Sequence, residues 1–362
     1  MTPFLAVERL SVGEFATLRE EWRVLHTCAG GDVFQAWEWL HPWRRHLGRG
    51  ELMLLALRRR GDLIAIAPLF RSTYFGLPLR RLMLLGCGIT DRLGIVAEPA
   101  AEARTAAYLL DYLMHAASPR EFIDLHQLPA DAPLLAAPTP AGCRELRFPQ
   151  EACPFVALPA TWDEFTARLG KRMRENVAYY PRRLAREFRV EIDVADTAGV
   201  AAAVDDFIRL HQARWRARGL PGALGGARLR AFHHAAAPLL LERGWLRLYT
   251  LRLDGEAAAS LYCLEHDERV AYYLGGMDPR YARFSLGTVL TAHAMRDAIE
   301  RGAREFDFLR GDEAYKLAWG AAIRWQWRRL LWRDGPLNAI LPRLIAIERE
   351  AEQAIKRWAG RR

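Results

Sequence analysis

The sequence contains one pattern twice, and each copy starts with two strand-like runs joined by a tight turn. The first copy opens with residues 51–70, turning near Gly61, and the second opens with residues 245–264. The second turn, Asp254-Gly255, is the stronger hairpin signal because both residue types tolerate positive φ. A chain with this repeat is expected to fold as two similar α/β (α+β) units.

The remaining elements of each copy follow in the same order: an apolar run that ends in glycine, an amphipathic helix, and a strand that begins Glu-Phe. These elements lie at 81–88, 101–117 and 121–128 in the first copy and at 270–276, 285–302 and 305–312 in the second. The match favours a duplication, although unrelated α+β units also reuse such motifs. A Pro- and Ala-rich stretch marks the boundary, which predicts domains 1–145 and 150–334 and a C-terminal helix over 335–362.

Composition narrows the class of protein. Half of the 362 residues are apolar, yet no apolar run approaches the roughly 20 residues that span a bilayer. The five scattered cysteines argue against a disulfide framework and a zinc site, and His233-His234 has no third ligand, so no metal is expected. The N-terminus lacks a signal peptide, which predicts a cytoplasmic protein. The net charge of +9 favours phosphate-bearing cofactors, RNA and anionic membranes without choosing among them.

Six further segments occur in a characteristic order along the chain: 34–43, 86–96, 171–188, 211–219, 273–290 and 306–320. Together they resemble the CelD/BcsL-like acyltransferases with a GNAT fold and the related FemABX aminoacyltransferases. The resemblance extends over most of residues 1–330. It implies a pair of GNAT-like domains, each a mixed, mainly antiparallel sheet flanked by helices.

The helix expected from Ser285 is the predicted donor site for acetyl-CoA or a longer acyl-CoA. A helix start offers free N–H groups and the positive end of the dipole to a pyrophosphate, and a glycine lets the phosphate approach closely. The GNAT turn reads Arg/Gln-x-x-Gly-x-Gly/Ala; here Gly287 matches the last position, while Ser285 replaces the first glycine. A plain N-cap is the alternative for Ser285. The predicted cofactor-binding residues are Arg283, Ser285, Leu286, Gly287 and Thr288.

Tyr315 and Lys316 resemble the Tyr-Lys-x-x-Phe element of FemABX proteins, with tryptophan in place of phenylalanine, and the resemblance puts this lysine at the transfer centre. A fixed ammonium there would stabilise developing negative charge, whereas the alternative is a solvated surface lysine. Asp91 resembles the aspartate that follows the glycine-rich strand end of FemABX enzymes; a turn-forming residue is the alternative. Asp307 alternates with two phenylalanines on a strand and is expected to orient a donor or to pair with an arginine.

Four residues at helical spacing form the predicted substrate-binding stripe: His211, Arg214, Trp215 and Arg218. Core packing beneath the arginines is the alternative for His211 and Trp215. Residues 168–189 carry eight basic residues against two glutamates, and the segment reads as a short basic helix interrupted by a proline. The coiled-coil hairpin of FemABX proteins is missing there, which makes tRNA a disfavoured partner.

The sequence therefore predicts an N-acyltransferase that moves an acyl group from acyl-CoA to a small-molecule amine. The resemblance implies a nucleotide-sugar, polysaccharide or envelope precursor as acceptor, in the context of exopolysaccharide biosynthesis. Two alternatives stay open: a FemABX-type transfer from aminoacyl-tRNA to a peptidoglycan precursor, and a degenerate scaffold that binds RNA or an anionic membrane. DNA is not an expected partner. The C-terminal amphipathic helix, expected after Pro342, has a basic end that also suits peripheral contact with the inner face of a membrane.

Overall fold

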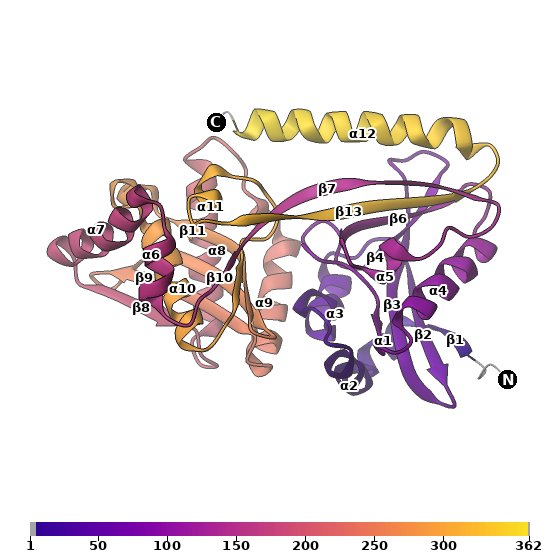
Figure 1. The fold of residues 1–362 in the computed structure, drawn as a ribbon, viewed down its shortest axis with the longest axis horizontal. Helices are drawn as coiled ribbons and strands as arrows, with labels where there is room; N and C mark the ends of the chain where they lie inside the picture. Colours follow the sequence, from indigo (N-terminus) through magenta and orange to yellow (C-terminus); the bar gives the residue numbers. More distant parts are fainter. Residues whose placement is uncertain (1–4, 361–362) are drawn as a thin grey trace. The chain divides into compact units, whose positions relative to one another are not determined.

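The computed structural model describes residues 5–360 and contains two compact units (Figure 1). Unit 1 consists of residues 5–151 and 325–360, and unit 2 of residues 152–324. Each unit is a mixed, mostly antiparallel sheet flanked by helices, which confirms the fold class expected from the repeat.

The sheet of unit 1 combines strands from both ends of the chain. In spatial order its strands are β1 (Leu5–Leu10), β2 (Glu51–Arg59), β3 (Asp62–Thr73), β4 (Arg80–Leu84), β6 (Glu121–Pro129) and β13 (Ala322–Arg333). Only β4 and β6 run parallel, and the short β5 (Val96–Ala97) pairs with β3. The predicted hairpin at 51–70 is β2 and β3.

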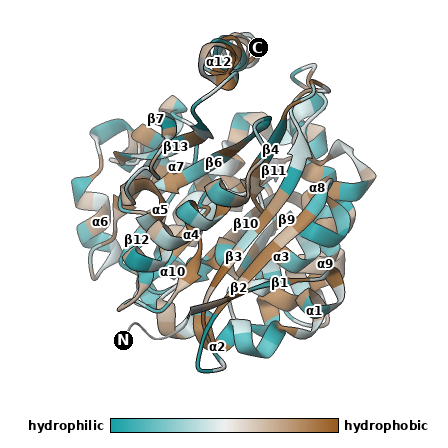
Figure 2. Ribbon diagram, turned by 90° about the vertical axis from the view of Figure 1, so that its right-hand side faces the viewer, coloured by the Kyte–Doolittle hydropathy of each residue, from teal (hydrophilic) through white to brown (hydrophobic). Residues whose placement is uncertain are grey.

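The sheet of unit 2 repeats this order. Its strands are β8 (Val190–Val194), β9 (Leu246–Leu253), β10 (Glu256–His266), β11 (Arg269–Met277), β12 (Glu305–Asp307) and β7 (Cys143–Ala157). Again a single pair is parallel, here β11 with β12. The equivalence of β4–β6 with β11–β12 supports the predicted repeat. In Figure 2 the central strands of both sheets carry long hydrophobic stretches, as expected for strands covered on both faces.

The last strand of each sheet comes from a segment outside the repeat that it completes. β13, which follows unit 2 in the chain, pairs with β6 of unit 1, and β7, which follows β6, pairs with β12 of unit 2. Residues 325–334, which the sequence reading assigned to the second domain, therefore lie in unit 1. The presumed linker at 130–159 contains the 15-residue β7, whose two prolines concealed the strand.

Helices cover both faces of each sheet. In unit 1, α4 (Glu102–Ala116) packs on β2, β3 and β6, while α2 (Arg19–Ala29) and α3 (Trp37–His46) bury tryptophans. In unit 2, α6 (Trp162–Arg168), α7 (Lys171–Glu187) and α10 (Leu286–Glu300) share one core. The opposite face carries α8 (Val200–Arg216) and α9 (Ala227–Glu242). The short helices are α1 (Val12–Thr17), α5 (Pro133–Ala136) and α11 (Ala314–Leu317).

Two prolines proved compatible with helices. Pro181 lies inside the continuous α7, so the predicted interruption was wrong. The C-terminal helix α12 (Leu337–Gly360) begins before Pro342 instead of after it. Its first turns bury Leu337, Leu341 and Ile345 against unit 1. Among residues 5–360, no helix has the length and apolar character needed to cross a membrane.

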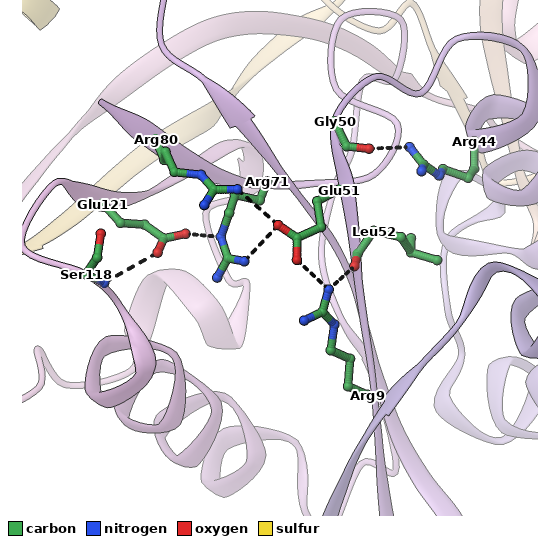
Figure 3. A network of polar contacts seen from close by, with 9 residues as sticks. All are labelled: Arg9, Arg44, Gly50, Glu51, Leu52, Arg71, Arg80, Ser118 and Glu121. Atoms are coloured by element: carbon green, nitrogen blue, oxygen red, sulfur yellow. Dashed lines mark hydrogen bonds and ion pairs between the residues drawn. The ribbon is translucent and has the colours of Figure 1, made fainter. Parts of the chain in front are cut away.

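The Glu residue that opens the parallel strand of each copy is held by arginine. In unit 1, Arg71 binds both Glu121 and Glu51, and Arg9 and Arg80 also bind Glu51, at 2.6 and 3.0 Å (Figure 3). In unit 2, Glu305 forms ion pairs with Arg269 and Arg324, at 2.6 and 2.5 Å. These ion pairs fix the start of the parallel strand at equivalent places in both sheets.

Candidate active site

The two parallel strands of unit 2 stay paired over three residues only. β12 pairs with β11 from Arg269 to Ala271, and β11 then runs on for six residues to Met277, where its pairing within the described chain is to β10. Beyond Ala271 the other edge of these six residues has no strand partner in the described part of the chain, and the Gly275 carbonyl there faces the His211 side chain, so the remaining edge groups can meet a ligand. This edge of β11 is the starting point of the site.

A small, partly open pocket lies at this part of β11. Ser260 on β10 and the glycine pair Gly275-Gly276 form one wall, the first turns of α10 form another, and Arg214 on α8 lines it as well. All of these elements belong to unit 2 (Figure 1). The structure thus brings one residue of the predicted helix start, Gly287, and one residue of the predicted α8 stripe, Arg214, to the same pocket.

The start of α10 has the geometry expected of an anion site. Ser285 adopts a left-handed conformation with φ of 50° and makes no side-chain cap, so its hydroxyl is left for other partners. The first N–H groups of the helix, including those of Leu286 and Gly287, have no partner inside it. Thr288 follows in the first turn, its N–H bonded to the Ser285 carbonyl at 2.9 Å.

Gly287 lines the pocket beside Met277. A Cβ at this position would lie 3.0 Å from the terminal methyl carbon of Met277, so a larger residue would fill the space next to the strand edge. Arg283 is mostly exposed and forms an ion pair with Glu187 on α7, at 3.0 Å. The predicted basic residue of the donor site is therefore close to the helix start but already has a carboxylate partner.

His211 is buried beside the free edge of β11. Its Nδ1 lies 3.2 Å from the carbonyl oxygen of Gly275, which can only accept, so Nδ1 carries the proton. Nε2 is then an acceptor, and it has no hydrogen-bond partner among the described residues. Burial lowers the pKa of His211 to about 4; the Gly275 bond partly offsets this, and the charge of Arg214 adds to it. The imidazole is therefore neutral at neutral pH.

Arg214 is half-buried and lines the pocket without a carboxylate partner in the part of the chain from 5 to 360. It is also the only charged residue in the lining of this pocket. Two other members of the predicted stripe have different surroundings. The indole N–H of Trp215 is buried and has no hydrogen-bond partner among the described residues. Arg218 is exposed and lies beyond the end of α8, with its guanidinium 6.0 Å from the Trp215 ring centroid. Arg214 is the stripe residue best placed to meet a ligand.

Tyr272 and Tyr315 form a hydrogen-bonded pair next to this pocket. Burial raises the pKa of Tyr272, and the charge of Arg214 opposes that shift. Tyr315 lies on α11, and desolvation, with Tyr272 as neighbour, raises its pKa as well. Both phenols therefore keep their protons near neutral pH.

Lys316, the next residue on α11, is buried and fully engaged by its own loop. Its ammonium donates to the carbonyl oxygens of Arg310 and Gly311, at 2.7 and 3.1 Å, and pairs with Glu313 at 2.9 Å. An ammonium has three N–H groups, and all three are used. The alternative of a solvated surface lysine is thereby excluded, and the contacts describe a lysine that closes the 310–313 loop.

The two candidate aspartates lie in different units. Asp307 is buried at the end of β12, where it accepts a hydrogen bond from the N–H of Leu309 at 2.8 Å and pairs with Arg324 at 3.3 Å. This is the arginine pairing that the sequence left open. Asp91 is buried in unit 1, in the loop between β4 and β5.

The sequence did not predict the site residues that lie on strands. The apolar run at 270–276 was identified, but no role was given to its glycines Gly275 and Gly276. A Cβ on Gly276 would lie 2.6 Å from the carbonyl carbon of Leu210 and nearer still to the backbone nitrogen of His211, so the glycine lets α8 approach β11. Ser260 and Tyr272 carry no local motif; only the register of β10 and β11 brings them to the pocket.

Comparison with known proteins places the fold. Residues 171–317 match the family model described as an acetyltransferase (GNAT) domain. None of the curated proteins matches the sequence at a significant level. The fold is similar to that of FemX, with a TM-score of 0.64 at 14% identity over 94% of this chain and 99% of that one.

Two further solved structures share the architecture. The C-terminal domain of a putative lysylphosphatidylglycerol synthetase from Agrobacterium fabrum gives a TM-score of 0.57 at 13% identity, covering 93% of this chain and 96% of that one. L-PGS from Bacillus licheniformis gives 0.56 at 14%, covering 95% and 97%. The family match therefore lies within unit 2, and the likeness to these solved structures extends over both units. At these identities the structural likeness concerns the fold alone.

Proposed function

We propose that unit 2 transfers an acyl group from acyl-CoA to a primary amine. The observation that carries this proposal is the pocket between the free edge of β11 and the start of α10. The helix start suits the pyrophosphate of the donor, with Ser285 and Gly287 closest to it, and the strand edge suits the amide groups of the pantetheine arm. The acyl carbonyl then lies near Arg214 and Tyr272.

In the proposed reaction the amine nitrogen attacks the thioester carbonyl, forming a C–N bond, and the C–S bond breaks. The nitrogen loses a proton to water, and the leaving thiolate gains one from a phenol that water then reprotonates. Tyr315, kept protonated by its surroundings, is the proposed donor to the thiolate, and the neutral His211 helps to orient the acceptor. Lys316 and Asp307 hold the loop after β12, whereas Asp91 lies in unit 1 and takes no part in this proposal.

The charge of the pocket bears on the choice of donor. Arg214 would repel the ammonium of an aminoacyl group, and the lining contains no carboxylate to receive it. This favours a neutral acyl group as the donor's cargo over an aminoacyl group carried by tRNA. The Fem-type alternative, which uses aminoacyl-tRNA, is supported by the fold likeness to FemX. We propose a cytoplasmic enzyme whose acceptor is a nucleotide-sugar, polysaccharide or envelope precursor, as in the CelD/BcsL-like proteins that the sequence resembles.

Calorimetric titration of the full chain with acetyl-CoA, longer acyl-CoAs and charged tRNA tests this proposal. Gly287→Val places a branched side chain against Met277 and is expected to weaken acetyl-CoA binding about tenfold or more, a loss on the scale of one crowded contact. Gly170→Ala is the control, because a Cβ there meets no atom within 4 Å. Exchange protection by acetyl-CoA should fall on β11 and α10. Binding of charged tRNA alone, or protection confined to unit 1, would contradict the proposal.

A further inference from the structure

The C-terminal helix α12 has two apolar sides. Leu337, Leu341 and Ile345 face unit 1 and are buried. A second set is exposed: Ile340 is 51% accessible, Ile347 62%, Ile355 65% and Trp358 51%. At about 100° per residue, positions 340, 347 and 358 fall within about 20° of one direction and position 355 within about 60°. We call these four residues the exposed ridge.

The exposed ridge is a candidate binding surface. Single exposed apolar residues are ordinary on protein surfaces, but four on one side of one helix give that side an apolar character. The polar contacts of α12 are directed elsewhere: Glu348 accepts from Arg328 and Tyr74, and the Arg349 guanidinium lies 4.0 Å from the centroid of the Phe148 ring. These contacts fix the rotation of the helix and leave the ridge outward. Figure 2 shows both hydrophobic and hydrophilic residues on α12.

Charge indicates what the partner is. The segment 355–362 contains Lys356, Arg357, Arg361 and Arg362 and no acidic residue, in a chain of net charge +9. A tryptophan within a basic amphipathic segment suits the boundary between lipid headgroups and acyl chains. A second copy of the chain would bring an equally basic segment to the ridge, not a complementary one.

We propose that the exposed ridge lies in the surface of an anionic lipid bilayer and holds the protein there as a peripheral protein. The apolar side chains would enter the headgroup boundary, and the basic residues at 355–362 would meet lipid phosphates. This inference is independent of the acyl-transfer proposal, because it uses only unit 1 and the C-terminal segment.

Flotation of the full chain with phosphatidylcholine vesicles, with and without phosphatidylglycerol, tests the inference. The protein should bind the anionic vesicles. The double variant Ile347→Asn/Ile355→Asn should lower the partition coefficient about tenfold or more, because it loses two isoleucines that the bilayer would bury. Ile323→Asn is the matched control: this isoleucine is 45% exposed but lies on β13. Because all three side chains are exposed, unchanged circular dichroism and melting temperature are expected.

Charge is tested by Lys356→Gln/Arg357→Gln, which should lower binding to anionic vesicles by about fivefold for each lost charge and leave any binding to neutral vesicles unchanged. Equal binding by the ridge variant and the wild type would overturn the inference. The inference would also be overturned if the wild type did not bind anionic vesicles but formed a dimer that the ridge variant could not form, because the ridge would then bind a second copy of the chain. Acetyl-CoA titration of the same variants should be unchanged whichever result is found.

Discussion

Arg328 donates two hydrogen bonds to the carboxylate of Asp124, at 2.8 and 2.9 Å, across 204 positions of sequence. Both side chains are almost fully buried, at 1% and 0% exposure. Burial alone would raise the pKa of Asp124, but His126 and Arg328 outweigh it and hold this pKa well below its ordinary value. The pair joins β13 to β6 and so attaches the end of the chain to unit 1.

Asp124→Ala is expected to lower the free energy of unfolding of unit 1 by about 3–5 kcal/mol, because it leaves Arg328 buried with only Glu348 as a carboxylate partner. The control is Glu268→Gln, which removes an exposed pair with Arg304 and should cost less than about 1 kcal/mol. Urea unfolding of both variants measures the difference. An equal loss of unfolding free energy in both variants would show that the buried Asp124–Arg328 pair stabilises the protein no more than an exposed pair does.

His233 should make the stability of unit 2 depend on pH. Burial lowers its pKa to about 3, whereas an unfolded histidine titrates near 6.5. The unfolded state therefore binds a proton first as pH falls, so stability is full above about pH 6.5 and declines toward pH 3, by up to about 1.4 kcal/mol per pH unit.

His233→Phe should reduce this dependence without abolishing it, because the buried His211, with a pKa of about 4, contributes in the same direction. His234→Phe changes a partly exposed neighbour paired with Asp205 and should leave the dependence unchanged. Thermal unfolding between pH 7 and pH 4 separates the two variants. A slope in His233→Phe as steep as that of the wild type would assign the effect to other groups.

Gly276→Ala is expected to destabilise unit 2 by about 1–3 kcal/mol or more, because the new methyl group would press on the backbone of α8 at Leu210 and His211. Gly170→Ala offers the same chemical change in open space and should be nearly neutral. Denaturant midpoints compare them. Because the methyl group would displace His211, which is proposed to orient the acceptor, the Gly276 variant should also raise the KM for the acceptor.

Lys316→Met tests two roles of one ammonium. It leaves the buried carbonyls of Arg310 and Gly311 without their donor, which is expected to cost about 1–3 kcal/mol for each group. If Lys316 also stabilises charge during transfer, kcat should fall by about 10²-fold well below the melting temperature. Glu313→Gln, which keeps both carbonyl bonds, is the control. A loss of stability with unchanged kcat would limit Lys316 to holding the loop.

Deletion of residues 336–362 should lower the stability of unit 1 far more than that of unit 2. The deletion removes Leu337, Leu341 and Ile345 from the unit 1 core and takes Glu348 from Arg328. Hydrogen exchange followed by mass spectrometry resolves the units separately. Similar protection of both units after deletion would be unexpected.

Local patterns predicted the elements, and long-range pairing did not follow from them. The hairpin at 245–264 has a strong turn at Asp254 and alternating apolar residues, so β9 and β10 were readable. The exchange of β7 and β13 depends on which sheet edge each strand meets, and no local signal carries that information. A strand with two prolines was read as a linker for the same reason.

In the candidate site, too, local sequence patterns predicted some residues, and strand register determined others. Gly287 and Arg214 were found because helix starts and helical stripes have a recognisable spacing, and both line the pocket. Ser260 and Tyr272 lie on strands and enter the pocket only through the register of β10 with β11. The three contacts of Lys316 depend on how the 310–313 loop turns, which residue types alone do not determine.

The exchanged strands also set an order of events during synthesis on the ribosome. The sheet of unit 2 needs β7 to β12, so all of its strands have been translated once residue 307 has been added. The sheet of unit 1, although encoded first, waits for β13, which ends at residue 333. A nascent chain therefore has to keep the open edge of β6 out of contact with other chains while more than half of the protein is still being made.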